Sequence, residues 1–222
     1  MFAVQFPGRH TRAREPPPTS VTAAANSFWS RAQSSTGQSL FFGKRVAFYG
    51  QCIGGFFALH FAASYSRLFP QSPPVTLVTS ACPSPDSLSV LTDYTSGYSS
   101  SPQLSRKDQL REGLHALTLA IGFSEDDWLR LSQNPAMYNA LVQDVHMTDA
   151  EEPFCIPEGS NFGACISILG DEDPVVETKH VLGWTEAGAP TTTFITLPSL
   201  GHNIQYEVPL IQRVEQVVSS LP

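Results

Sequence analysis

Three residue types that cooperate in covalent catalysis occur along the chain in the order cysteine, aspartate and histidine. Cys52 lies at the centre of residues 50–54, GQCIG, which have the form Gly-x-nucleophile-x-Gly. A thiolate at this position can attack a carbonyl carbon, provided that a general base is near. We expect Cys52 to be the nucleophile, His202 its base and Asp173 the acid that orients the base.

The residues around Cys52 predict a sharp turn from a strand into a helix. Residues 46–49 are β-branched and aromatic, as in a buried strand, and residues 56–62 carry a helical apolar pattern. Glycines on either side of the cysteine would relieve crowding, as in the nucleophile elbow of α/β-hydrolases. The helix dipole would favour a thiolate there, although a free cysteine can equally be a small buried core residue.

The candidate acid and base each follow a predicted strand. Residues 165–169 precede the segment GDEDPVV at 170–176, and residues 193–197 precede His202. In α/β-hydrolases the acid and the histidine follow the nucleophile on such loops. Asp171 competes with Asp173, which is preferred because it stands before Pro174 in a Gly-x-x-Asp pattern. The remaining histidines lack this context, namely His10, His60, His115, His146 and His180.

Alternating strands and helices predict an α/β fold with a mostly parallel sheet and helices on both faces. Further strands are expected at 75–79 and 2–6, and a helix at 19–33. A chain of 222 residues suits one α/β-hydrolase domain spanning residues 1–222.

The alternation stops between residues 78 and 165. Residues 83–102 form a serine-rich loop, and residues 104–152 read as two or three helices inserted in the sheet. Such an insertion suits a lid that excludes water and shapes a substrate pocket, with Trp128 and Leu141 as substrate-binding residues. The same apolar residues could instead only pack the helices together.

The composition of the chain argues against several classes of binding partner. The formal net charge is −7, and no lysine or arginine run offers a path for phosphates, which argues against nucleic acid. The four cysteines include no Cys-x-x-Cys pair, so neither a metal nor another cofactor is expected. Without a signal-like segment or an apolar run of about 18 residues, we expect a cytoplasmic protein with reduced thiols and no membrane contact.

Several motifs in order give the chain a resemblance to the type II thioesterases of polyketide and non-ribosomal peptide synthesis. Phe6-Pro7-Gly8-Arg9, with Arg12, Glu15 and Pro16, is similar to a signature of that family. The other matching segments are residues 50–54, 80–85, 134–144, 170–175 and 201–202. The resemblance extends over nearly the whole chain from Phe2 onward.

This resemblance implies a thioesterase that releases acyl groups from the phosphopantetheine thiol of an acyl or peptidyl carrier protein. The substrate would carry the phosphopantetheine, and the backbone N–H of Ile53 would be an oxyanion donor. Cys52 departs from the family's usual serine. The family also has a strand and a Phe-Pro-x-x-Gly-Gly-like loop ahead of the segment at Phe2, which supplies a second oxyanion donor. Without that loop we expect slow turnover and association.

Two other functions fit parts of the pattern. The Gly-x-Cys-x-Gly-Gly sequence at 50–55 also resembles the elbow of Cys-dependent lactone hydrolases and acyltransferases of the α/β-hydrolase superfamily. The absent oxyanion loop would suit a degenerate, non-catalytic module that binds carrier proteins. The signature at residues 6–16 and the helical insertion favour the thioesterase.

Overall fold

The computed structural model describes residues 3–12, 14–32, 41–87, 89–90, 105–149, 156–158, 160–204 and 212. Within this part of the chain, the strands form one parallel sheet in the order β1-β2-β3-β4. The strands are β1 Ala47–Gln51, β2 Val75–Ser80, β3 Phe162–Gly170 and β4 Thr192–Leu197. The helices are α1 Val21–Ala32, α3 Gly54–Leu68, α5 Arg106–Ala120, α6 Glu125–Gln133, α7 Pro135–Asp149 and α8 Thr178–Val181, with short 3-10 helices at His10–Arg12, Pro85–Ser87 and Leu182–Thr185.

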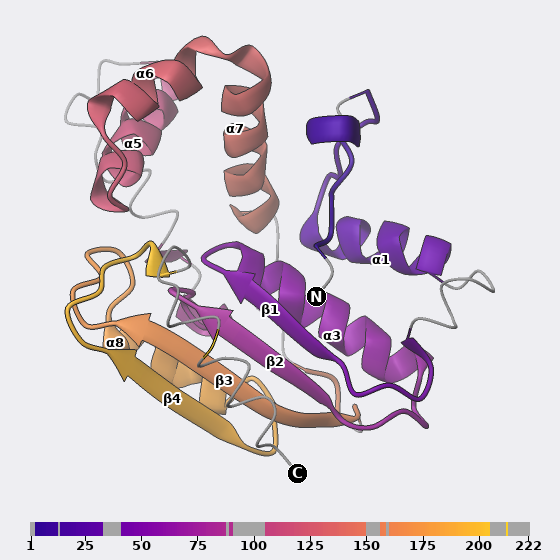
Figure 1. Cartoon of the computed structure of the whole chain (residues 1–222). Coiled ribbons are helices and arrows are strands. Elements are labelled where there is room, and N and C mark those ends of the chain that lie inside the picture. Colours follow the sequence, from indigo (N-terminus) through magenta and orange to yellow (C-terminus); the bar gives the residue numbers. More distant parts are fainter. Residues whose placement is uncertain are drawn as a thin grey trace.

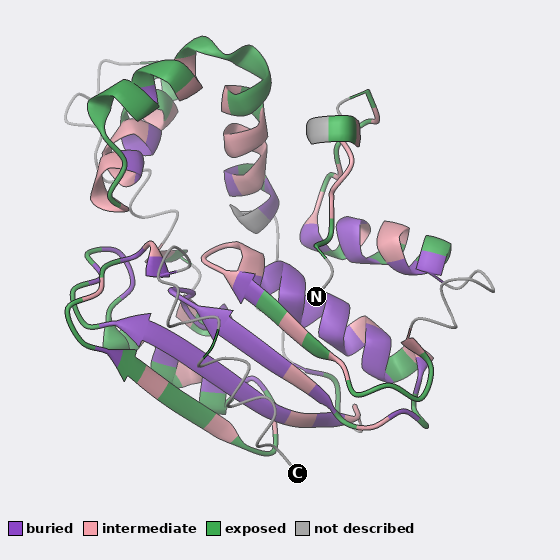
Figure 2. Ribbon diagram, viewed as in Figure 1, coloured by how far each residue is buried: buried purple, intermediate pink, exposed green. Residues whose placement is uncertain are grey.

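The inner strands β2 and β3 are buried along nearly their whole length, whereas β1 and β4 carry exposed positions (Figure 2). On one face, Leu77 packs into a cluster with α1, α3 and Trp184. On the opposite face, Val78 packs with Ile166 and Ile168. Burial on both faces explains the continuous apolar runs, and the predicted α/β-hydrolase fold class is confirmed.

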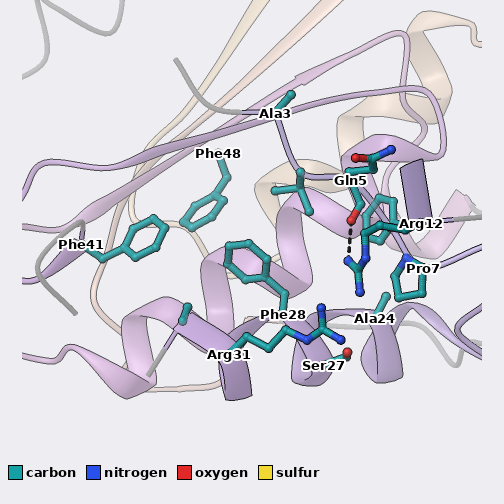
Figure 3. Close-up of a pocket in the computed structure, with 13 residues that line it drawn as sticks. Ala3, Gln5, Pro7, Arg12, Ala24, Ser27, Phe28, Arg31, Phe41 and Phe48 are labelled. Carbon is teal, nitrogen blue, oxygen red and sulfur yellow. Dashed lines mark hydrogen bonds between the residues drawn. The ribbon is translucent and has the colours of Figure 1, made fainter. Parts of the chain in front are cut away.

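The strand expected at residues 2–6 is not found over the described residues 3–6. A cavity of about 410 Å³ separates this segment from Phe48 of β1, with Phe28 and Phe41 among its walls (Figure 3). Arg12 Nη1 also donates to the carbonyl oxygen of Gln5 at 2.7 Å, which occupies a backbone acceptor that a strand would need. Phe6 of this segment therefore packs on the core rather than in a strand.

Helices α5, α6 and α7 are inserted between β2 and β3, where helices were predicted at 104–152. Two of them begin at serine caps, because the Ser105 and Ser124 side chains accept backbone N–H groups of the first turn. The insertion has its own core around Leu114, Trp128 and Val145. It stands on the side of the carboxyl ends of the strands (Figure 1), the edge at which parallel sheets bind ligands. In the described part of the chain, no helix is long and apolar enough to cross a membrane.

Candidate active site

Cys52 lies in the turn between the end of β1 at Gln51 and the start of α3 at Gly54. Its φ angle is +49°, a left-handed value that non-glycine residues seldom adopt. The Cys52 N–H donates to the carbonyl oxygen of Ser80, at the end of β2, at 2.9 Å, which anchors the turn to the neighbouring strand. The side chain remains partly exposed. A strained, anchored turn that presents a reactive side chain is typical of a functional position.

Two glycines, Gly50 and Gly55, make this turn possible. Of the two, only Gly50 belongs to the Gly-x-Cys-x-Gly motif. A Cβ on Gly50 would lie 2.0 Å from the carbonyl oxygen of Gly54, and a Cβ on Gly55 would lie 2.4 Å from Cys82 Sγ. At Gly54 a Cβ would meet nothing within 4 Å. The sequence motif predicted crowding at Gly50 and Gly54. The structure shows crowding at Gly50 and at Gly55 instead of Gly54.

Asp173 and His202 form a buried pair on the loops that follow β3 and β4. His202 Nδ1 lies 2.9 Å from Oδ2 and 3.1 Å from Oδ1 of Asp173. The N–H groups of Val175 and Val176 each donate to Asp173 Oδ1 at 2.9 Å, which fixes the carboxylate. The competing carboxylate, Asp171, instead accepts the Ser199 N–H at 2.7 Å. The structure thus pairs His202 with the acid that the sequence favoured.

The two ring nitrogens of His202 have different surroundings. Nε2 is buried and has no hydrogen-bond partner of ordinary geometry among the described residues. Cys52 nevertheless acts on the same ring. Burial lowers the pKa of His202, but the Asp173 hydrogen bond and the interaction with Cys52 together raise it to about 10. Catalytic hydrogen bonds are often long or poorly aligned before substrate binds. The arrangement of Cys52 and His202 is therefore compatible with a thiol and its general base.

Two further side chains at the site were not identified from the sequence. Gln51 Nε2 donates to the backbone carbonyl oxygen of His202 at 3.0 Å, so the elbow holds the base loop directly. Asn203 Nδ2 donates to the carbonyl oxygen of Ile121 at the end of α5. Their positions in the sequence could have suggested them, because Gln51 directly precedes the candidate nucleophile and Asn203 directly follows the candidate base.

Ile53, the expected oxyanion donor, is the N-cap residue of α3 and follows Cys52 in the turn. The first N–H groups of a helix have no partner within the helix, and the helix dipole favours negative charge there. The position therefore suits an amide that stabilises a developing oxyanion.

The two lid residues expected to bind substrate lie within the core of the lid. Trp128 is buried, stacks on His115 and packs with Leu114, and Leu141 contacts the same cluster. At the end of α5, Leu117, Ala120 and Ile121 pack against the main core cluster, as Cys52 and Ile53 also do. Substrate binding by Trp128 and Leu141 stays a prediction.

Neither a metal nor a cofactor is needed to explain the residues gathered here. In the part of the chain that the structure describes, no group of three histidine, cysteine, aspartate or glutamate side chains is arranged to hold a metal ion. The cavity at residues 3–7 is not lined by Cys52, Asp173 or His202.

No protein family and no curated protein matches the chain. Solved structures do match it. The type II thioesterase BorB from the borrelidin biosynthetic cluster is 18% identical over 97% of this chain and 80% of BorB, with a TM-score of 0.65. ClbQ from the colibactin NRPS/PKS pathway is 18% identical over 98% of this chain and 84% of ClbQ, with a TM-score of 0.64.

The RedJ thioesterase from the prodiginine pathway of Streptomyces coelicolor is also 18% identical, over 97% of this chain and 73% of RedJ, with a TM-score of 0.64. An α/β-hydrolase family protein from Desulfitobacterium hafniense matches with a TM-score of 0.58. At these identities the likeness shows the fold, and the chain has the α/β-hydrolase fold shared by these thioesterases.

Proposed function

We propose that this protein is a thioesterase that hydrolyses acyl groups from phosphopantetheine thioesters on acyl or peptidyl carrier proteins. Cys52 is the nucleophile, His202 the general acid and base, and Asp173 the residue that orients His202. The observation that carries the proposal is the buried, hydrogen-bonded pair of Asp173 and His202, with the loop of His202 bound by Gln51 beside Cys52 at the elbow. The fold likeness to type II thioesterases supports the choice of carrier-bound substrates.

Acylation begins from the Cys52 thiolate beside the protonated His202. The thiolate sulfur attacks the thioester carbonyl carbon, and the backbone N–H of Ile53 stabilises the oxygen that becomes negative. The bond between the carbonyl carbon and the pantetheine sulfur then breaks. The leaving sulfur takes the proton from His202, so that a free pantetheine thiol and an acyl-Cys52 thioester remain.

Deacylation uses the same residues in reverse. Neutral His202 takes a proton from water, and the resulting hydroxide attacks the carbonyl carbon of acyl-Cys52. The bond between that carbon and the Cys52 sulfur breaks, which releases a carboxylic acid and restores the thiolate. Asp173 holds the imidazole tautomer in both steps, since its oxygens accept from Nδ1.

A cysteine nucleophile favours thioesters over oxygen esters as substrates. Exchange of one thioester for another is nearly thermoneutral, whereas a thiolate that attacks an oxygen ester must form a more reactive product. The thioester class therefore fits Cys52 better than an ester or lactone does.

Cys52 also supports a second candidate, acyl transfer. An acyl-Cys52 thioester is reactive enough to pass its acyl group to another thiol or alcohol instead of water. Hydrolysis and transfer share every residue named above and differ only in the acceptor.

The test is turnover of an acyl-pantetheine and of an acylated carrier protein, with free thiol and carboxylic acid both measured. Cys52→Ala and His202→Ala should each lose about 10³-fold or more in kcat/KM. His115→Ala, which changes a lid histidine stacked on Trp128, is the matched control. Equal hydrolysis by wild type and Cys52→Ala would contradict the proposal. Wild-type thiol release without acid, accompanied by acylation of an added alcohol, would indicate acyl transfer.

A further inference from the structure

The loop that carries His202 is joined directly to the lid. The Asn203 side chain donates from Nδ2 to the backbone carbonyl oxygen of Ile121, which is the C-cap residue of α5. A carbonyl oxygen only accepts hydrogen bonds, so the amide nitrogen, not the amide oxygen, must face it. Residues 82 positions apart in the chain are thereby held together.

The turn that accepts this hydrogen bond is well defined. The Ile121 N–H donates to the Leu117 carbonyl oxygen at 3.0 Å, and the Gly122 N–H donates to that of Leu119 at 3.0 Å. Gly122 has a φ of +94°, and a Cβ there would lie 3.4 Å from Asn203 Nδ2. The end of α5, at Leu117, Ala120 and Ile121, packs against the same buried core cluster as Cys52 does. This turn therefore contacts the base loop through Asn203 and shares a core cluster with the nucleophile.

The His202 backbone is held from the other side by the elbow, because Gln51 Nε2 donates to the His202 carbonyl oxygen at 3.0 Å. The base loop thus lies between a contact to the elbow at Gln51 and a contact to the lid at Asn203. The ring itself has a fixed partner at Nδ1, whereas Nε2 has no hydrogen-bond partner of ordinary geometry within the described part of the chain. A displacement of the α5 end acts through Asn203 on the residue next to His202.

We propose that Asn203 is a positioning residue that couples the lid to His202, so that the base is aligned with Cys52 only while the end of α5 is docked. This inference rests on the proposed function. It implies that removing the Asn203 amide slows the chemical steps while leaving the binding of a short acyl substrate largely intact. A merely structural role would lower stability without separating kcat from KM.

The test compares Asn203→Ala with Asn161→Ala in turnover of a short acyl-pantetheine. Asn161 is a matched control because its Nδ2 also donates to a distant backbone carbonyl oxygen, that of Ser72, at 2.6 Å. We expect kcat of Asn203→Ala to fall about tenfold with KM within about twofold, and kcat of Asn161→Ala to stay within about twofold. A kcat for Asn203→Ala within about twofold of wild type would overturn the coupling.

A second variant perturbs the same contact from the lid. Gly122→Ala strains the turn at Ile121, and Gly188→Ala, at a glycine with φ of +99° that precedes β4, is its control. If one contact carries the coupling, kcat of the double variant Asn203→Ala/Gly122→Ala should lie within about twofold of kcat of the slower single variant. Multiplied losses would contradict a shared contact. Gly122→Ala also gives a reading if Asn203→Ala does not fold.

The Cys52→Ala variant separates the two proposals. If Cys52→Ala is inactive and Asn203→Ala is fully active, the coupling is wrong and the proposed function stands. If Cys52→Ala hydrolyses thioesters at the wild-type rate, the assignment of Cys52 as the nucleophile is wrong, and the coupling that aligns His202 with Cys52 is wrong as well.

Discussion

Nδ1 of His202 lies 2.9 Å from Oδ2 of Asp173, and both side chains are buried. Two backbone N–H groups fix the carboxylate, so the pair is oriented by the loop after β3 rather than by chance proximity. A carboxylate in this position selects the imidazole tautomer with the proton on Nδ1, which leaves Nε2 to exchange protons with Cys52, a substrate or water.

Neutralising Asp173 should therefore damage turnover far more than neutralising Asp171. We expect Asp173→Asn to lower kcat by about 10²–10⁴, because the amide can hold the wrong tautomer. Asp171→Asn is the matched control, since Asp171 also accepts a backbone N–H, that of Ser199. Steady-state kinetics with one acyl-pantetheine measures both. A larger loss for Asp171→Asn would mean that the acid is assigned wrongly.

Cys52 should react with iodoacetamide much faster than the other thiols that the structure describes. Cys52 is partly exposed, whereas burial raises the pKa of Cys82 well above its ordinary value and that of Cys165 to about 12. Thiolate, not thiol, is the form that is alkylated. Peptide mapping at neutral pH over short reaction times gives the order. Labelling of Cys82 before Cys52 would count against the elbow assignment.

Alkylation of Cys52 should in turn lower the pKa of His202. In the unmodified protein this pKa is raised from 6.5 to about 10 although burial lowers it, because the Asp173 hydrogen bond and Cys52 both favour the imidazolium. Alkylation removes the contribution of Cys52. Titration of the imidazole nitrogens by NMR before and after alkylation measures the shift, and an unchanged pKa would show that Cys52 does not act on the ring.

The same pKa has a consequence for stability. A histidine whose pKa is raised in the folded protein stabilises the fold fully below its ordinary pKa of 6.5, and loses that contribution as the pH rises through about 10. In the alkylated protein we expect the loss to occur over a lower pH range. Urea unfolding between pH 6 and 10 compares the two forms.

The sequence was sufficient to predict the strands that end at the site from their β-branched and aromatic residues, although β1 and β4, unlike β2 and β3, are not buried on both faces. It also placed Cys52, Asp173 and His202 on the loops that follow those strands, since parallel strands all end at one edge of a sheet. The crowding at Gly55 depends on Cys82, which is distant in sequence. Local spacing could not reveal such a contact.

The contacts that join separate elements were also beyond local patterns. Asn203, on the loop after β4, contacts Ile121 at the end of α5, and residues 3–6 resemble a strand in sequence yet lie across a cavity from β1. Strand formation requires a partner as well as a suitable pattern. Propensity alone does not supply the partner.

Arg9 should hold α7 to the N-terminal segment in a pH-dependent manner. Its Nη2 donates to the Ala140 carbonyl oxygen at 3.1 Å and pairs with Asp144 Oδ1. Burial raises the pKa of Asp144 to about 6, more than Arg9 lowers it. Above pH 6 the carboxylate is ionised and interacts most strongly with the guanidinium, so Arg9→Gln should cost about 1–3 kcal/mol of unfolding free energy at pH 8 and less at pH 5.

The control for that change is Arg31→Gln, because the Arg31 side chain is 66% exposed and pairs with Glu15 at 3.3 Å. We expect a cost within about 0.5 kcal/mol at either pH. Denaturant unfolding at pH 8 and pH 5 gives both values. A cost for Arg9→Gln that is the same at both pH values would show that ionised Asp144 is not its main partner.

The most direct test of the account is the mass of the intact protein after brief mixing with an acyl-pantetheine. Wild type should gain the mass of one acyl group, hydroxylamine should remove it, and peptide mapping should locate it on Cys52. The amount of adduct on Asp173→Asn compares the two steps, because more adduct than in wild type means that deacylation has slowed more than acylation. An adduct that persists in Cys52→Ala and disappears when another cysteine is changed would contradict the central claim that Cys52 is the nucleophile.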